Sequence, residues 1–531
     1  MLRKKGYINI SHDTSSGISG VIYWSHNLLP SARARISLFK KSVLKNYRIA
    51  HLEVSDRGEF EISGTENGEY IITVHAEDEN GAHINRHARL RVYPNLISPV
   101  AIPLSKNRYR DVSGTFDIMD ILKLQERSNP FASNLLLIKK FIYERPSQPC
   151  NDKEWYEHLK KNNLLPLLIS PKDALIITHS KSPVMIRGDF NNWEYASPLV
   201  KMPRSDVWIY WIKVSEDTLL QYKLVKTPGE YVCDEANPLV NTADDMGRGN
   251  SILKMPRAQW HVTYKPAIAH GKICTFSFTN EMYRYSKKIH VYLPPGYCET
   301  ARPYKTVYLN DGRMFMNNYI IHVLDNWIAS GLIPELVFVL IEESYHYREL
   351  EFVPLQYYPL RMRETAEKSL KVKIARGIVP GWYGELYKVY GETIRNSIIP
   401  CVEKNFNLSK DRKDRAILGH SFGAVVSLYL ADTYPECFRN IGIQSWSGMG
   451  ALSNTIYPYR LYIGEGVWEL AGGILWGIGS NCKITNKNEF KKYTRHLFGK
   501  NTVYVIDVYS GGHSPFSWYT VIPKMIRFFW R

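Results

Sequence analysis

The chain has 531 residues, of which 44% are hydrophobic and 22% are charged. This length exceeds what one hydrophobic core supports, and the composition is that of an ordinary folded protein, so we expect several domains and exclude bulk disorder. The net charge of +17 is compatible with an anionic small molecule, but no long Lys/Arg block indicates a nucleic-acid partner.

Cysteine usage and hydropathy favour a cytoplasmic protein. The seven cysteines form no CxxC pair and no histidines lie at zinc-finger spacing, so we expect reduced thiols and no metal site. The basic first residues lack the apolar stretch of a secretion signal, and no segment approaches the roughly 20 apolar residues of a membrane span. We therefore expect no membrane partner, and no organic cofactor is implied.

Residues 1–104 are expected to form an Ig-like β-sandwich. Short β-rich runs at 20–24, 34–39 and 70–74 alternate with turn signals, and no catalytic constellation occurs among them. The paired sequences GEF at 58–60 and GEY at 68–70 resemble small Ig-like modules beside many enzymes. Residues 105–165 have helix-compatible spacing, interrupted by prolines, and we interpret them as a helical linker region that packs against its neighbours.

Residues 166–258 are predicted to form a second β-sandwich. The ordered sequences GDFNNW at 188–193, YK at 222–223 and DEANP at 234–238 resemble the early-set domain and the carbohydrate-binding family 48 modules. By that resemblance a sugar site would use Trp193, Lys223, Tyr231 and Asn250, since an aromatic face stacks on a sugar while polar groups bind its hydroxyls. Carbohydrate is thus one candidate partner, but we favour a domain whose aromatic residues only pack its core.

Residues 259–531 alternate strands and helices, which predicts a doubly wound α/β sheet. One β-rich run, at 415–418, leads into Gly419-His420-Ser421-Phe422-Gly423 and then into a helical run. G-x-S-x-G between a strand and a helix is the nucleophile elbow of the α/β-hydrolases, in which glycines permit a tight turn and helix amides stabilise an oxyanion. We predict that Ser421 is the nucleophile.

A serine hydroxyl needs a general base, and the hydrolase order is serine, acid, histidine. His513 follows a C-terminal strand in a Gly-rich turn and is the expected base. The acid is expected just beyond the strand at 459–463, where Glu469 is our first choice and Glu465 the second.

These motifs together resemble the putative-esterase family, which includes enterochelin esterases, esterase D, mycolyltransferases and feruloyl or acetylxylan esterases. The resemblance rests on LPPGY at 293–297, LNDG at 309–312, the R-x-x-E-F run at 348–352, the elbow, and GGH at 511–513 with Trp518. It implies an oxyanion hole formed by the backbone amides of Phe422 and Arg313. A G-x-x-E sequence often supplies the family's acid, which supports Glu469, although some members use a Ser–His dyad. The Ser514-Pro515 sequence after the histidine departs from many relatives, so the resemblance does not predict the lining of the pocket there.

The function expected from the sequence is hydrolysis of a carboxylic ester through an acyl-enzyme, with a small, siderophore-like (enterochelin-type) substrate first. Arg348 could meet an anionic substrate group or form an ion pair with Glu351, and Trp518 is a second candidate substrate-binding residue. The alternatives are a carbohydrate-linked esterase of the feruloyl or acetyl type, an acyltransferase, and a glycan-binding scaffold with an inactive hydrolase domain. An intact elbow and His513 argue against the scaffold.

Overall fold

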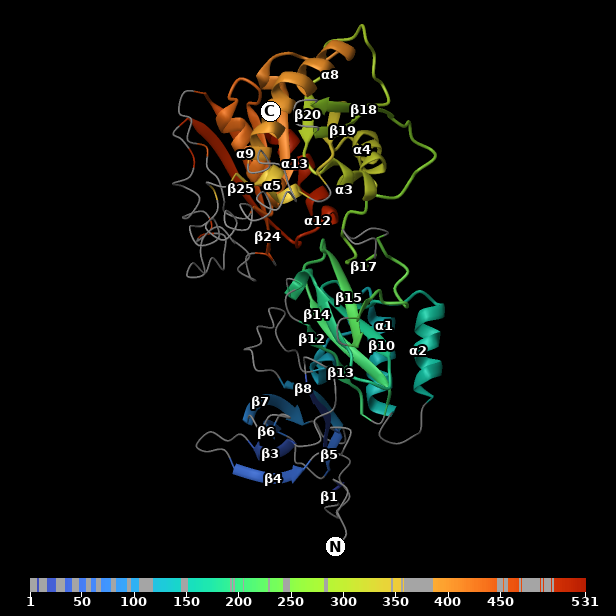
Figure 1. Cartoon of the computed structure of the whole chain (residues 1–531). Helices are drawn as coiled ribbons and strands as arrows, with labels where there is room; N and C mark the ends of the chain where they lie inside the picture. The colour runs from blue at the N-terminus through green and yellow to red at the C-terminus, as the bar shows by residue number, and fades with distance from the viewer. Residues whose placement is uncertain are drawn as a thin grey trace. The chain divides into compact units, whose positions relative to one another are not determined.

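The computed structural model describes eight strands within residues 1–104 and most of the chain beyond residue 117. The described positions after that point are 118–144, 151–191, 193, 196–203, 205–227, 230–241, 249–280, 285–344, 347–354, 357, 385–446, 452, 457–467, 469, 488, 490, 498 and 501–531. The chain divides into two compact units, one of residues 1–241 with 249–258 and one of residues 242–248 with 259–531 (Figure 1).

The first part of unit 1 contains two four-stranded sheets, ordered β1-β5-β2-β8 and β4-β3-β6-β7. Alternating apolar residues in the second sheet, such as Ile36 and Leu38, are fully buried, as the period of a strand with one covered face requires. The strands are β1 Tyr7–Ile8, β2 Gly17–Trp24, β3 Ala34–Lys40, β4 Tyr47–Glu53, β5 Glu59–Ser63, β6 Gly68–Glu77, β7 His83–Val92 and β8 Ile97–Leu104.

The rest of unit 1 packs helices against a second pair of sheets, ordered β13-β14-β10-β9 and β12-β11-β15-β16, with β17 beside β15. The helices are η1 Ile118–Lys123, α1 Ala132–Glu144, α2 Asp152–Lys161 and the short η2 Asp189–Asn191. The strands are β9 Leu167–Ser170, β10 Asp173–His179, β11 Met185–Gly188, β12 Ser197–Pro198, β13 Val200–Lys201, β14 Val207–Lys213, β15 Leu219–Thr227, β16 Glu230–Val232 and β17 Ser251–Lys254. Leu135 of α1 and Leu159 of α2 join the same core as Ile177 of β10, so these helices belong to the domain core and are more than a connecting segment.

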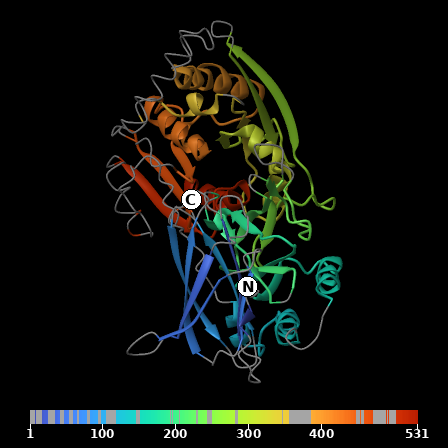
Figure 2. The ribbon, with the colours of Figure 1, turned by 60° about the horizontal axis from the view of Figure 1, so that its bottom comes forward.

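Unit 2 is built on an eight-stranded sheet in the order β18-β19-β21-β20-β22-β23-β24-β25. The long β18–β19 hairpin lies at one edge (Figure 2) and pairs antiparallel, as does β19 with β21, whereas all later pairs are parallel. The sheet is therefore mixed, and the parallel pairing typical of a doubly wound sheet holds only from β21 onward. The strands are β18 Lys272–Asn280, β19 Tyr285–Leu293, β20 Thr306–Leu309, β21 Val337–Ile341, β22 Arg415–His420, β23 Asn440–Gln444, β24 Tyr459–Gly466 and β25 Thr502–Tyr509.

Helices cover both faces of this sheet. On β23, Ile441 and Ile443 join the core cluster that contains α9, whereas a Cβ on the intervening Gly442 would meet Met525 of α13 at 2.7 Å. Because neighbouring strand residues face opposite sides, α9 and α13 lie on opposite faces. The helices are α3 Gly312–Asn317, α4 Ile320–Ala329, α5 Arg348–Phe352, α7 Leu386–Thr393, the π-helical η5 Ile394–Ile398, α8 Ile399–Asn405, η6 Arg412–Asp414, α9 Phe422–Thr433, α12 Pro515–Tyr519 and α13 Ile522–Phe529. In the part of the chain that the structure describes, no helix is long and apolar enough to cross a membrane.

Candidate active site

Ser421 lies in a strained turn between β22 and α9. Its backbone has φ 56° and ψ −123°, a conformation that costs a non-glycine residue on the order of 1–3 kcal/mol. The strain is held by hydrogen bonds on both sides, since the Ser421 amide donates to the Gln444 carbonyl at 3.0 Å and the Ala424 amide donates to the Ser421 carbonyl at 3.0 Å. The turn lifts the serine out of the sheet at the carboxyl end of β22.

The two glycines of the elbow are required by close packing. A Cβ on Gly419 would lie 1.9 Å from the Gly423 carbonyl oxygen, and a Cβ on Gly423 would lie 2.6 Å from Oδ2 of Asp311. The second approach also shows that the loop after β20 lies against the start of α9. In that loop, Asn310 donates to Oγ of Ser427 at 2.9 Å, and Ser427 donates to the Gly423 carbonyl at 2.7 Å.

His513 and Glu469 are joined by a hydrogen bond. Nδ1 of His513 lies 2.7 Å from Oε1 of Glu469, and the carboxylate is 2% exposed while the imidazole is 36% exposed. Such a bond fixes the neutral imidazole with its proton on Nδ1 and leaves Nε2 free to accept a proton. A buried acid beneath a partly exposed histidine is the arrangement that a general base requires.

The second oxygen of Glu469 is held by two donors, one of which sequence reasoning missed. Oε2 accepts from Oγ of Ser445 at 2.9 Å and from the Gly466 amide at 3.0 Å. Ser445 directly follows β23 with φ 49°, and its Oγ accepts from Nε1 of Trp518 at 2.6 Å. The position of Ser445 at the carboxyl end of a parallel strand, where functional residues gather in such sheets, is the signal that could have found it.

Trp518 packs between His513 and the nucleophile elbow. Its ring stacks on His420, the residue before Ser421, with centroids 4.5 Å apart, and meets His513 edge-on at 5.4 Å. The indole is 2% exposed. Trp518 is therefore a buried packing partner of His513, and its expected role as a substrate-binding residue is not supported by this position.

His420 is a neutral neighbour of the nucleophile. Its Nε2 lies 2.7 Å from Oε1 of Gln444, and burial, with a smaller contribution from His513, lowers the pKa of His420 to about 3. The imidazole therefore carries no charge across the ordinary working range of pH. It cannot serve as a competing base whose ionisation would be mistaken for that of His513.

Glu465 is buried like Glu469, but its hydrogen-bond partner differs from those of Glu469. Its Oε2 accepts from the Trp446 amide at 3.2 Å, and no hydrogen bond to His513 is found for it among the described residues. Burial, and secondly the Glu469 carboxylate, raise the pKa of Glu465 well above its usual range. Of the two carboxyl groups considered from the sequence, Glu469 is the one in contact with His513.

Arg348 is engaged by the protein. Its Nε and Nη2 donate to the two carboxylate oxygens of buried Asp311 at 2.5 and 2.9 Å, and Nη2 also approaches the His420 carbonyl at 3.4 Å. An ion pair of Arg348 with Glu351 was one of the two roles considered from the sequence, but Glu351 instead pairs with the buried ammonium of Lys287. Arg348 thereby braces the loop after β20 against the elbow, and its guanidinium is already bound where a substrate anion was considered.

Arg313, expected to contribute an oxyanion amide, has that amide bound in this structure. The Arg313 N–H donates to Oε2 of Glu343 at 3.2 Å, and its guanidinium donates to the Glu343 carbonyl at 2.9 Å. An oxyanion could use this amide only after Glu343 moves. The amide of Phe422, the other expected donor, begins α9 directly after Ser421.

The protonation of Glu343 should make the stability of unit 2 depend on pH. Burial, and secondly the charge of Asp311, raise the pKa of Glu343 to about 7. Because the folded state then binds this proton more tightly than the unfolded state, stability falls as pH rises from about 4.5 through 7. Glu343→Gln should therefore gain about 1–3 kcal/mol relative to the wild type between pH 5 and pH 8.

Thermal unfolding of both proteins across this range measures the effect, with Glu299→Gln, at an exposed position, as the control. A difference between Glu343→Gln and the wild type that does not change with pH would contradict it.

The four residues considered for a sugar site do not form one open face. Lys223 and Asn250 are only 6% and 8% exposed, and Nδ2 of Asn250 donates to Oε1 of Gln221 at 2.6 Å. Tyr231 is partly exposed beneath the guanidinium of Arg187, and Trp193 donates to Oδ1 of Asp189 at 2.9 Å. Two of the four side chains are thus unavailable to a carbohydrate in this structure.

Comparison with known proteins places an esterase match on unit 2. Residues 280–510 match the family model described as putative esterase. The uncharacterized protein YbbA of Bacillus subtilis (strain 168) is 28% identical over 162 residues, which are 30% of this chain and 57% of that protein. The chain thus spans a little over half the length of this curated relative.

Solved structures with a similar course of the chain include two enterobactin esterases. The ferric enterobactin esterase of Salmonella typhimurium has 15% identity and a TM-score of 0.48, covering 67% of this chain and 93% of that one. The enterobactin esterase of Shigella flexneri has 13% identity and a TM-score of 0.47, covering 67% of this chain and 92% of that one.

The family match and the mixed sheet support an α/β-hydrolase-like fold and a hydrolase of the esterase type. Within the described residues, no group of three or more His, Cys, Asp or Glu side chains could hold a metal ion.

Proposed function

We propose that this protein is a serine esterase in which Ser421, His513 and Glu469 form a catalytic triad. The observation that carries the proposal is the 2.7 Å contact between Nδ1 of His513 and Oε1 of Glu469. It lies at the same end of the sheet as Ser421, which is held at positive φ. The packing of Trp518 against both His513 and His420 supports the proximity of base and nucleophile.

In the proposed reaction, Oγ of Ser421 attacks the ester carbonyl while Nε2 of His513 takes the hydroxyl proton. The resulting oxyanion is stabilised by the Phe422 amide, and by the Arg313 amide once Glu343 has moved. His513 then gives its proton to the leaving alcohol, which departs as the acyl-enzyme forms. Water, deprotonated by His513, hydrolyses the acyl-enzyme and restores Ser421. Glu469 orients the imidazole and stabilises its charged form throughout.

The proposed substrate is a small carboxylic ester, with a siderophore-like ester first. The net charge of +17 is compatible with an anionic substrate. A carbohydrate-linked ester has less support, because Lys223 and Asn250 are buried. The location of the protein in the cell stays a prediction from the sequence.

Labelling with a fluorophosphonate tests the proposal directly, because these reagents react with serines activated by a base. We expect one label per chain, on the peptide that contains Ser421, and no label in His513→Ala. Peptide mass spectrometry locates the modified residue. A label on another serine, or ester hydrolysis by a protein that remains unlabelled, would exclude Ser421 as the nucleophile.

A further inference from the structure

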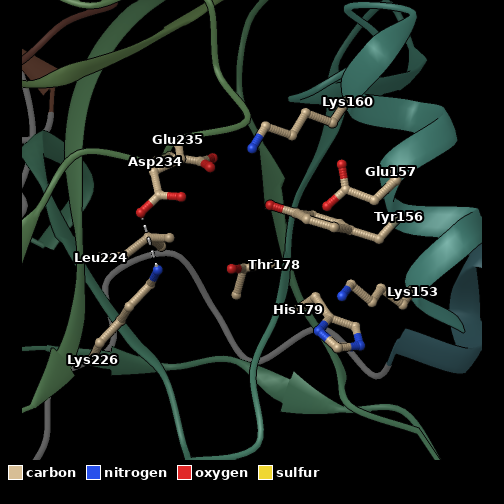
Figure 3. Close-up of a pocket in the computed structure, with 10 residues that line it drawn as sticks. All are labelled: Lys153, Tyr156, Glu157, Lys160, Thr178, His179, Leu224, Lys226, Asp234 and Glu235. Atoms are coloured by element: carbon tan, nitrogen blue, oxygen red, sulfur yellow. Dashed lines mark ion pairs between the residues drawn. The ribbon is translucent and has the colours of Figure 1, made fainter.

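Unit 1 contains a polar pocket of about 170 Å³ between α2 and the strands β10 and β15. Figure 3 shows the side chains of α2 facing those of the strands and of the loop after β16 across this space. Of the residues that line it, only Leu224 is aliphatic. The size is close to that of a roughly 150 Å³ cavity that holds benzene, so the pocket suits a molecule of about six to ten non-hydrogen atoms.

The wall formed by α2 is fixed by core packing. Tyr156 and Leu159 are buried in the same cluster as Leu175 and Ile177 of β10, so the helix cannot shift without opening the domain core. The Tyr156 hydroxyl is directed across the pocket (Figure 3), and burial, with the nearby Asp234, raises the pKa of Tyr156 to about 12. The phenol therefore remains a neutral hydrogen-bond donor at any working pH.

Several charged groups of the pocket already have protein partners. The buried carboxylate of Asp234 accepts from the Tyr222 hydroxyl at 2.7 Å and from the Ala236 amide at 3.0 Å. Lys226 lies 3.7 Å from Glu235, and Nε2 of His179 lies 3.8 Å from Asp152. The charged groups named here, on the side of the pocket opposite α2, therefore interact with other protein groups.

The α2 side of the pocket carries charged side chains of both signs that do not form such ion pairs with the residues that the structure describes. Lys153, Glu157 and Lys160 are spaced four and three residues apart and so share one face of the helix. Within the described part of the chain, none of the three has an ion-pair partner within 4.0 Å, although all line the pocket. Two ammonium groups and one carboxylate are thus available to a ligand.

We propose that this pocket binds a free α-amino acid, with an acidic one such as glutamate preferred. Lys153 and Lys160 would pair with the two carboxylates of the ligand, and Glu157 with its ammonium group, while the Tyr156 hydroxyl donates to a carboxylate oxygen. The charges are complementary, since glutamate has two negative groups and one positive group. The pocket volume of about 170 Å³ matches one amino acid and is smaller than an oligosaccharide or a peptide of several residues. This site is separate from the esterase chemistry, and neither proposal depends on the other.

Isothermal titration of the full chain with L-glutamate tests the proposal. Binding should be saturable, and it should weaken at least roughly tenfold for glutarate, which lacks the amine, and for N-acetyl-L-glutamate, whose amine is uncharged, because each loses a charged hydrogen bond. Lys160→Gln and Glu157→Gln should each weaken glutamate binding by a similar factor. Lys161→Gln is the matched control, because Lys161 is an exposed residue of the same helix that does not line the pocket.

The proposal is overturned if glutamate shows no binding at concentrations up to about 10 mM, or if glutarate or inorganic phosphate binds as tightly as glutamate. The latter result would identify a simple anion site. Unchanged affinity in both Lys160→Gln and Glu157→Gln, with unfolding temperatures equal to the wild type, would place any observed binding elsewhere on the chain.

Discussion

Ser421→Ala should lower kcat for a chromogenic ester by roughly four orders of magnitude or more, because the acyl-enzyme can no longer form. The unfolding temperature should remain within a degree or two, since alanine removes one hydroxyl at a partly exposed position. Initial rates with the wild type and the variant at matched concentrations measure the effect.

Ser421→Gly is the informative companion to this variant. Glycine adopts the observed φ of 56° without strain, so this protein should be as inactive as Ser421→Ala but more stable by about 1 kcal/mol or more. The pair separates the hydroxyl from the backbone strain. Substantial turnover by either variant would show that another residue carries the chemistry.

Glu469→Gln should reduce kcat by about two to four orders of magnitude while leaving KM nearly unchanged. Glutamine keeps the size of the side chain but can turn its amide N–H toward His513, which favours the wrong tautomer, and it cannot stabilise the charged imidazole. Ser445 and Gly466 both donate to the second oxygen of Glu469, so the single amide oxygen of glutamine should face them and leave the amide N–H toward His513.

Glu465→Gln is the matched control, four residues earlier in the chain. Burial raises the pKa of Glu465, which favours its uncharged form, and glutamine has the size and polarity of that form. We expect less than about a tenfold loss of kcat there. Equal and mild effects of both substitutions would favour a Ser–His dyad, and a larger effect at Glu465 would reassign the acid.

The sequence by itself determined the elements that depend on local chemistry. The strand-to-helix context of G-x-S-x-G predicted a strand ending at the elbow and a helix after it, and β22 and α9 lie there. The short β-rich runs at 20–24, 34–39 and 70–74 likewise predicted strands, and β2, β3 and β6 lie there. These predictions succeed because hydrophobic period and glycine conformation act within a few residues.

Contacts between distant segments were decided only by the tertiary structure. An ion pair of Arg348 with Glu351, three residues away, was one of two roles open from the sequence, but the fold brings Arg348 to Asp311 and Glu351 to Lys287. Ser445 gained its place between Glu469 and Trp518 because β23 and β24 are adjacent in the sheet, which spacing along the chain does not reveal. The antiparallel edge formed by β18 and β19 was equally invisible, since a buried strand has the same pattern in either direction. A side chain's partner depends on which segments the whole core brings together, and that is a property of the complete fold.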